Sequence, residues 1–215
     1  MAERILYTYY RSSASYRTRI VLNLKGLDYE PRFIHLRKGD QFGADYVKLN
    51  PQQQVPTLID EGLVLIQSPA IIEYIEEAYP TPPLLPRDLA GRARVRALAA
   101  AVGSDIHPIN NLRVLQYLRK QLKQEQPAVD DWVRHWVRLG FTAIETLLAE
   151  SAATGTYCHG DKPTLADAYL APQVYNAERF NYPTAEHPTL KRVHDNAMKL
   201  DAFKRAYPDN QPDAE

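Results

Sequence analysis

Three small hydroxyl residues stand where a short strand is expected to turn into a helix. The segment reads Tyr10-Arg11-Ser12-Ser13-Ala14-Ser15-Tyr16-Arg17. It follows the apolar run Ile5-Leu6-Tyr7 and precedes a helical segment, Ile20–Lys25, that Gly26 ends. Backbone N–H groups at a helix N-terminus lack partners, and the helix dipole favours negative charge there. Such a site can hold a carboxylate, a phosphate or a thiolate, and Arg11 and Arg17 add positive charge.

A simpler role is also open to these serines. Ser12, Ser13 or Ser15 can cap the helix by accepting a hydrogen bond from a backbone N–H group. Taken alone, the segment favours capping, so the choice between capping and anion binding depends on other parts of the chain.

Two further dipeptides offer similar alternatives. Val55-Pro56 opens a strand, where an ordinary trans proline is the simpler expectation. A cis bond would instead turn the N–H and C=O groups of Val55 outward, toward a peptide ligand. Gln67-Ser68 begins a helix, and Ser68 either caps it or binds a ligand carboxylate, with Gln67 donating a second hydrogen bond.

The elements that must position these residues alternate between strand and helix over residues 1–80. Strands are expected at Ile5–Tyr9, Pro31–Leu36, Val55–Asp60 and Leu63–Ile66, the last two joined by a Glu61-Gly62 hairpin turn. Helices follow the first two strands and the hairpin, which gives the order β-α-β-α-β-β-α. The sequence therefore predicts a small α/β domain with a mixed sheet.

The rest of the chain is expected to be helical. Four prolines in Pro80–Pro86 predict a stiff linker, so we assign residues 81–89 to it and 90–215 to an all-α domain. Pro108 should kink a long helix, and Thr164-Leu165-Ala166-Asp167 has the spacing of a capping box. Residues from Pro208 onward are expected to fray.

Composition narrows the class of protein. Lysine plus arginine and aspartate plus glutamate both number 26, so the formal net charge is zero, which argues against a dedicated nucleic-acid binder. The N-terminus lacks a signal-peptide pattern, and no apolar run is long enough to cross a membrane. The single cysteine, Cys158, cannot form an internal disulfide. A cytoplasmic location fits these features.

Several separated blocks together resemble the cytosolic glutathione transferases of the zeta class, which include maleylacetoacetate isomerase and similar bacterial maleylpyruvate isomerases. The first block, Arg11–Ile20, resembles the zeta signature serine-serine-cysteine-x-x-arginine-x-arginine. The others are Asn50–Leu58, Gln67–Tyr74, His107–Leu112 and Pro172–Phe180. The resemblance covers nearly the whole chain and implies a thioredoxin-like N-terminal domain, an all-α C-terminal domain and a homodimer.

The resemblance also implies glutathione as cofactor. Its γ-glutamyl carboxylate would meet Ser68 and Gln67, its cysteinyl backbone Val55 and its glycyl end Gln41. The sulfur would lie at Ser12–Ser15, with Ser12 the preferred hydrogen-bond donor and Ser13 the second choice. The cofactor-binding set implied is Ser12, Ser13, Ala14, Ser15, Arg17, Gln41, Gln54, Val55, Pro56, Gln67, Ser68 and His107.

One position departs from the family pattern. The signature cysteine is replaced by Ala14, and Cys158 is expected in the other domain. A dithiol redox role at this turn is therefore excluded, because it needs a cysteine pair. Any thiol that acts at the turn must arrive with glutathione.

The activity implied is glutathione-dependent cis–trans isomerisation of maleylacetoacetate in aromatic amino-acid degradation. Ser12, Ser13 and Arg11 would act at the sulfur, and the substrate's anionic ends would be bound by Arg11, Asn111, Arg113 and Arg179. For Arg179 a surface or structural ion pair is the equal alternative, and Arg113 could instead pair with an acid. For His107, capping of the kinked helix is favoured over catalysis. Leu112, where an additional arginine would suit a short dianion, favours maleylacetoacetate over maleylpyruvate. Two rival functions are a transferase acting on small α-halo acids and a non-catalytic protein that binds glutathione. No metal is implied.

Overall fold

The computed structural model describes residues 4–215 and divides into two compact units. The first unit joins the residues up to Pro83 to Leu200–Glu215, and the second is Leu84–Lys199. The sequence assigned residues 90–215 to one helical domain. The last sixteen residues instead pack with the first unit, because α9 (Asp201–Ala206) lies against α1 (Ser13–Lys25).

A four-stranded mixed sheet in the order β2-β1-β3-β4 forms the first unit's centre. Its strands are β1 (Ile5–Thr8), β2 (Glu30–Phe33), β3 (Thr57–Asp60) and β4 (Leu63–Ile66). β1 pairs with β2 in parallel, whereas the other two pairings are antiparallel. The predicted hairpin turn joins β3 to β4, with Glu61 at φ 50° and Gly62 at φ 81°. Positive φ at both central residues matches the twist of antiparallel strands.

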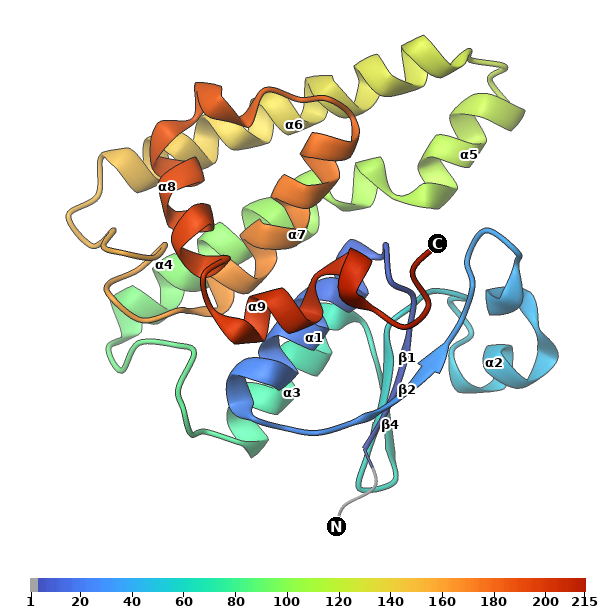
Figure 1. The fold of residues 1–215 in the computed structure, drawn as a ribbon, viewed down its shortest axis with the longest axis horizontal. Coiled ribbons are helices and arrows are strands. Elements are labelled where there is room, and N and C mark those ends of the chain that lie inside the picture. Colours follow the sequence, from blue (N-terminus) through green and yellow to red (C-terminus); the bar gives the residue numbers. More distant parts are fainter. Residues whose placement is uncertain (1–3) are drawn as a thin grey trace. The chain divides into compact units, whose positions relative to one another are not determined.

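The first unit's helices follow the predicted order. They are α1, α2 (Ala44–Leu49), α3 (Ser68–Ala78) and α9. Figure 1 shows α1 and α3 beside each other on one side of the sheet and α2 on the other. Lys25 of α1 and Glu76 of α3, both buried, form an ion pair at 2.5 Å that joins these two helices. The first unit is thus a thioredoxin-like domain, as the sequence predicted.

All regular elements of the second unit are helices. It contains α4 (Leu89–Ala100), η2 (Ala101–Ile106), η3 (Pro108–Asn110), α5 (Leu112–Lys120), α6 (Gln126–Ala149), α7 (Leu165–Arg179), η4 (Thr184–Glu186) and α8 (Pro188–Ala197). One face of α6 carries an apolar stripe at helical spacing, and its side chains are buried. They are Val133, Val137, Phe141, Ile144 and Leu148. Each such side chain contributes about 1.5–3 kcal/mol to the stability of the unit.

The structure corrects the predicted kink at Pro108. The long helix does not continue through the proline: α4 passes into a π-helical segment, η2, and a new helix starts at Leu112. Proline cannot donate a hydrogen bond, and Asn111 caps the new helix by accepting a hydrogen bond from Arg113 N–H at 3.1 Å. The local cap therefore converts a predicted kink into a helix boundary.

The predicted fraying of the last residues is also wrong. Pro208–Asn210 forms a 3₁₀ turn, and Pro208 is buried. Gln211 Nε2 donates to the carbonyl oxygens of Arg205 at 2.7 Å and Tyr207 at 3.0 Å. These contacts fold the tail back onto the end of α9.

Candidate functional site

The predicted helix cap at the β1–α1 turn is confirmed. β1 ends at Thr8, and Ser12 Oγ accepts a hydrogen bond from Ser15 N–H at 3.2 Å. Ser12 is half-buried, and its backbone N–H donates to the Tyr9 carbonyl at 3.1 Å. Among residues 4–215, no acceptor takes the Ser12 hydroxyl proton. A hydroxyl can accept and donate at once, so capping leaves this proton available to a ligand.

The remaining serines of the turn are less exposed than Ser12. Ser13 is 7% exposed, and Ser15 is fully buried, with its Oγ lacking a hydrogen-bond partner within the described chain. Arg11 is half-buried and places its guanidinium 5.9 Å from the centre of the Tyr10 ring. Arg17, in contrast, is only 1% exposed. Arg11 is therefore the cation of the pair that remains partly open to solvent.

The start of α3 differs from its prediction in one detail. Gln67, rather than Ser68, occupies the cap position, and Ser68 is the first helical residue. Gln67 has φ 69°, an uncommon conformation for a residue other than glycine, and its side-chain amide donates to Gln52 Oε1. Ser68 is buried, with an exposed fraction of 5%.

The peptide bond between Val55 and Pro56 is cis, so the simpler expectation of a trans bond is wrong. Both residues are buried and precede β3, outside its ladder. The carbonyl of Gln54 accepts hydrogen bonds from Tyr46 Oη at 2.5 Å and Asn50 Nδ2 at 2.8 Å. These bonds fix the backbone immediately before Val55.

The strand register brings these three segments to one edge of the sheet. Tyr7 pairs with Thr57, and Thr57 pairs with Ile66. Tyr7 is the penultimate residue of β1, Thr57 is the first residue of β3, and Ile66 is the last residue of β4. The β1–α1 turn, Val55–Pro56 and the start of α3 therefore leave the sheet at the same edge. The fold thus provides two neighbouring helix N-termini, which favour anions, beside the segment that precedes β3.

Gln41 lies outside these segments, in the short turn η1 (Asp40–Phe42). Its side chain is 6% exposed, and its Nε2 donates to the Leu36 carbonyl at 3.3 Å. Its Oε1 is buried without a hydrogen-bond partner in the described residues. A buried polar atom left in this way is costly, and a bound ligand or ordered water commonly satisfies it.

Four predicted site residues belong to the helical unit. His107 stands between η2 and η3, where its backbone N–H donates to the Val102 carbonyl at 2.9 Å. Asn111 caps α5, and the side chain of Arg113 is exposed. Arg179, the last residue of α7, lies 5.9 Å from the Tyr175 ring centre and 5.8 Å from that of Phe180. His107, Asn111 and Arg113 cluster within one segment, whereas Arg179 comes from another helix.

The capping box at the start of α7 is confirmed. Asp167 accepts hydrogen bonds from the backbone N–H and the hydroxyl of Thr164 at 2.8 and 2.9 Å. It also accepts one from Cys158 N–H at 2.8 Å. Burial raises the pKa of the Cys158 thiol well above its usual value. This protonated and enclosed thiol is no substitute for the signature cysteine.

Sequence reasoning missed three residues. Arg19, fully buried, donates to the carbonyls of Tyr9 and Tyr10 from its place in α1. Asp213 accepts from Tyr10 N–H at 3.0 Å. Asn110, 7% exposed, has neither amide atom hydrogen-bonded among the described residues. The signature arginine was a signal for Arg19, but no local pattern pointed to the other two.

Residues 4–215 contain neither a candidate metal centre nor a candidate membrane-spanning helix. No group of three or more histidine, cysteine, aspartate or glutamate side chains there is arranged to hold a metal ion. No helix within that range is both long and apolar enough to span a membrane.

Comparisons with known proteins agree with this geometry. Residues 2–77 match the model "Glutathione S-transferase, N-terminal domain", and residues 126–205 match "Glutathione S-transferase, C-terminal domain". A maleylacetoacetate isomerase of Pseudomonas aeruginosa is 50% identical, with 97% of each chain covered.

Two solved structures are similar to this chain. A holo maleylpyruvate isomerase, described as a bacterial zeta-class glutathione transferase, is 52% identical and superposes with a TM-score of 0.97 over 98% of this chain and 100% of that one. A maleylacetoacetate isomerase of Methylobacterium extorquens AM1, with bound malonate and glutathione, is 39% identical with a TM-score of 0.95 over 98% and 99%. The chain therefore belongs to the zeta-class glutathione transferase family, which includes the maleylacetoacetate and maleylpyruvate isomerases.

Proposed function

We propose that this chain is a glutathione-dependent cis–trans isomerase of maleyl-substituted keto acids, with maleylacetoacetate as its first substrate. The observation that carries the proposal is the edge of the sheet where the Ser12 helix start, Val55–Pro56 and the Gln67–Ser68 helix start meet. About half of the residues are identical to those of isomerases over nearly the full chain, which supports the same assignment.

The residues present fit glutathione. The N-terminus of α3, with Ser68 and Gln67, would hold the γ-glutamyl carboxylate, because exposed helix N–H groups favour a negative charge. The backbone of Val55 would pair with the cysteinyl residue, and the unpartnered Oε1 of Gln41 would accept a hydrogen bond from the glycyl N–H. The first unit thus offers groups that match the γ-glutamyl carboxylate, the cysteinyl backbone and the glycyl peptide of the tripeptide.

When bound, glutathione supplies a thiolate, which adds reversibly to the cis double bond and so allows rotation about it. A free thiol has a pKa of about 8.5, so little of it is ionised at neutral pH. The hydroxyl proton of Ser12, the dipole of α1 and the guanidinium of Arg11 would all favour the ionised form. Ser13, which is more buried, is the second candidate donor.

The anionic ends of the substrate require cations and hydrogen-bond donors. The resemblance implies that Arg11, Arg113 and Arg179 bind these carboxylates, to which a guanidinium can donate two parallel hydrogen bonds. Asn111 would contribute its side-chain amide, whose oxygen already caps α5. The dicarboxylate malonate bound with glutathione in the Methylobacterium structure supports a substrate of this charge.

Maleylpyruvate is the second candidate substrate. The 52% identity to a maleylpyruvate isomerase favours it. Leu112 at the neighbouring position favours the longer maleylacetoacetate.

An assay with substoichiometric glutathione tests the proposal. We expect each substrate to be fully isomerised while glutathione is recovered unchanged, and the ratio of kcat/KM values identifies the preferred substrate. Consumption of glutathione with release of halide from an α-halo acid, without isomerisation, would make the chain a transferase. Glutathione binding without turnover of either class of substrate would make it a binding protein.

We also propose a homodimer, with α3 and α4 at the interface. The family resemblance motivates this proposal, and Leu89 at the start of α4 is 84% exposed. The mass in solution should equal two chains, and a mass of one chain would refute the proposal.

A further inference from the structure

We propose that Asp213 is a positioning residue for the glutathione site. Its carboxylate, near the end of the described chain, holds the backbone turn that places Ser12. This inference rests on the proposed function, because it assumes that Ser12 acts on the glutathione sulfur. It assigns a role to residues near Asp213, which lie outside the sequence blocks that carry the family resemblance.

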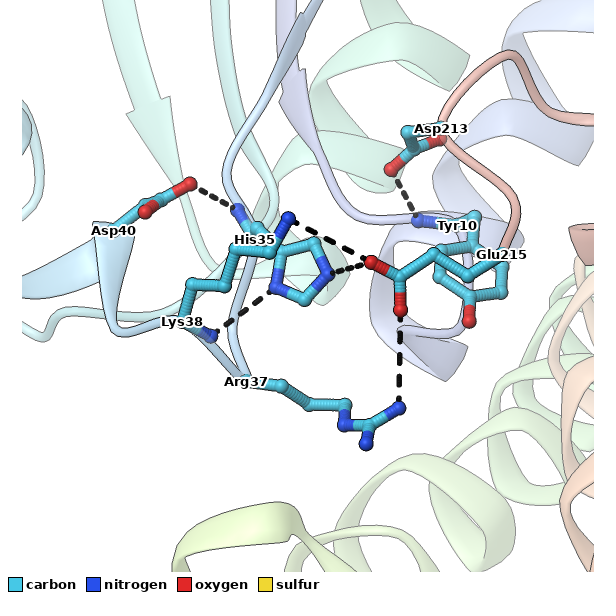
Figure 2. A network of polar contacts seen from close by, with 7 residues as sticks. All are labelled: Tyr10, His35, Arg37, Lys38, Asp40, Asp213 and Glu215. Atoms are coloured by element: carbon cyan, nitrogen blue, oxygen red, sulfur yellow. Dashed lines mark hydrogen bonds and ion pairs between the residues drawn. The ribbon is translucent and has the colours of Figure 1, made fainter.

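The peptide groups of Tyr10 are held by charged side chains at both ends. Its N–H donates to Asp213 Oδ2 at 3.0 Å, as Figure 2 shows, and its carbonyl accepts from Arg19 Nη2 at 2.9 Å. Hydrogen bonds to charged groups are roughly twice as strong as those between neutral ones. Tyr10 lies two residues before Ser12, so these bonds fix the approach of the chain to the α1 cap.

Arg19 connects the same turn to α9. Its guanidinium donates from Nε and Nη2 to the Ala206 carbonyl at 3.1 and 3.0 Å, and from Nη1 to Thr8 Oγ1 at 3.1 Å. Ala206 is the last residue of α9, immediately before the tail. The tail therefore starts from a point that is already tied to the turn.

Contacts on both sides hold Asp213 in place. Gln211 is fixed by its two hydrogen bonds to the end of α9. Glu215 accepts a hydrogen bond from His35 Nε2 at 2.7 Å, with Arg37 at 3.8 Å and Lys38 at 3.7 Å (Figure 2). Because residues before and after Asp213 are anchored, its position beside the turn does not depend only on its hydrogen bond with Tyr10.

The second oxygen of Asp213 argues against a purely stabilising role. Asp213 Oδ1 is buried and has no hydrogen-bond partner among residues 4–215. A buried carboxylate oxygen left in this way costs stability, so a neutral acceptor would serve a merely structural contact better. The charge instead strengthens the one bond that it makes, to the turn. Displacement of a reacting group by about 1 Å can slow a reaction by about 100-fold, so rigidity there has a direct effect on chemistry.

Three variants test the inference. Asp213→Ala removes the acceptor, Asp213→Asn retains a neutral one, and Asp201→Ala changes an exposed carboxylate on α9 as a matched control. The measurements are the glutathione affinity by calorimetry, the thiol pKa of bound glutathione by thiolate absorbance, amide hydrogen exchange at Tyr10, and the thermal midpoint.

For Asp213→Ala we expect glutathione affinity to fall about tenfold, as for the loss of a hydrogen bond to a charged group. We also expect the bound thiol pKa to move toward about 8.5 and exchange at Tyr10 to accelerate. Asp213→Asn, which keeps a neutral acceptor, should recover only part of the affinity, and Asp201→Ala should match the wild type. A lower thermal midpoint with unchanged affinity and thiol pKa would overturn the inference. If Asp213→Ala does not fold, Asp213→Asn provides the test. Glutathione affinity and Tyr10 exchange equal to those of the wild type in Asp213→Asn would then overturn the inference.

The two proposals fail in distinguishable ways. The affinity, thiol pKa and exchange measurements require no maleyl substrate. Wild-type protein that binds glutathione without isomerising either substrate removes the proposed function, while the effect of Asp213 on the bound thiol still decides the inference. Wild-type protein that does not bind glutathione removes both.

Discussion

Two helix starts in this molecule are both capped by polar side chains, but with different results. At α7, the Asp167 carboxylate accepts three hydrogen bonds, from two groups of Thr164 and from Cys158 N–H, and is 1% exposed. At α1, Ser12 Oγ accepts one hydrogen bond, at 3.2 Å, and remains half-buried. At the start of α7 the capping carboxylate is buried and fully hydrogen-bonded. At the start of α1 the hydroxyl proton of Ser12 remains available to a ligand.

The source of support also differs between the two starts. The partners of Asp167 lie three and nine residues away, while Tyr10 before the α1 cap is held by Asp213, 203 residues away. A helix start supported from within its own segment serves folding. One supported from distant parts of the chain can keep its own polar groups for a ligand.

The largest expected effect is on stability, at the start of α7. Asp167→Ala leaves the N–H groups of Thr164 and Cys158 buried and unpaired, so we expect it to lower the free energy of unfolding by about 3 kcal/mol. Chemical denaturation measures this change. Glutathione affinity of the folded variant should not change, and its loss in a stable variant would contradict the division between the two starts. Asp161→Ala, an exposed carboxylate that accepts from Thr156, is the control and should cost far less.

The next effect is on catalysis, at the start of α1. Ser12→Ala removes the proposed donor to the sulfur, and kcat/KM for isomerisation should fall about 100-fold, as for loss of an oxyanion-hole donor. The lost cap should cost only about 1 kcal/mol of stability. Ser13→Ala is the matched comparison, expected to retain most activity. A larger loss for Ser13→Ala would transfer the donor role to Ser13.

A smaller effect is expected on substrate binding in the helical unit. Arg179→Lys keeps the charge but removes the paired donors of a guanidinium, so KM should rise about tenfold while kcat changes little. Glutathione affinity should be unaffected. An unchanged KM would favour the alternative in which Arg179 is structural, packed between the Tyr175 and Phe180 rings.

The smallest expected effect is on the pH dependence of stability, through the contact between Glu215 and His35. The hydrogen bond from His35 holds the pKa of Glu215 below its usual value. A lowered pKa in the folded state means that this contact contributes stability above the usual carboxyl pKa of about 4.3 and loses it as the pH falls through the lowered value. The thermal midpoints of wild type and Glu215→Gln should therefore differ slightly at neutral pH and converge in acid. Glu215→Gln should also accelerate amide exchange at Tyr10 slightly, because Glu215 anchors the segment that carries Asp213. Asp195→Asn, which breaks the exposed Lys191–Asp195 pair of α8, is the control and should leave exchange at Tyr10 unchanged.

Much of the fold followed from local patterns. The Glu61-Gly62 turn, the end of α1 at Gly26 and the capping box of Thr164 and Asp167 all appear where the sequence placed them. Each depends on a few neighbouring residues, so periodicity and turn chemistry are sufficient to find it.

The failures have two causes, a competing local cap and contacts between distant residues. The boundary at Pro108 depended on a competing cap at Asn111, and the order of the last residues depended on partners far away in the chain, such as His35 and Tyr10. For Gln41, the family resemblance implied a ligand contact, and the fold showed an amide oxygen buried without a partner among the described residues.

The sequence by itself determined the order of strands and helices, the serine-rich helix start and the absence of a thiol at Ala14, because these are properties of adjacent residues. Only the tertiary structure decided which segments meet at one edge of the sheet and which side chains hold the turn before Ser12. Strand register and the return of Asp213 to Tyr10 join residues far apart in the chain, and such contacts leave no periodic signal in the sequence.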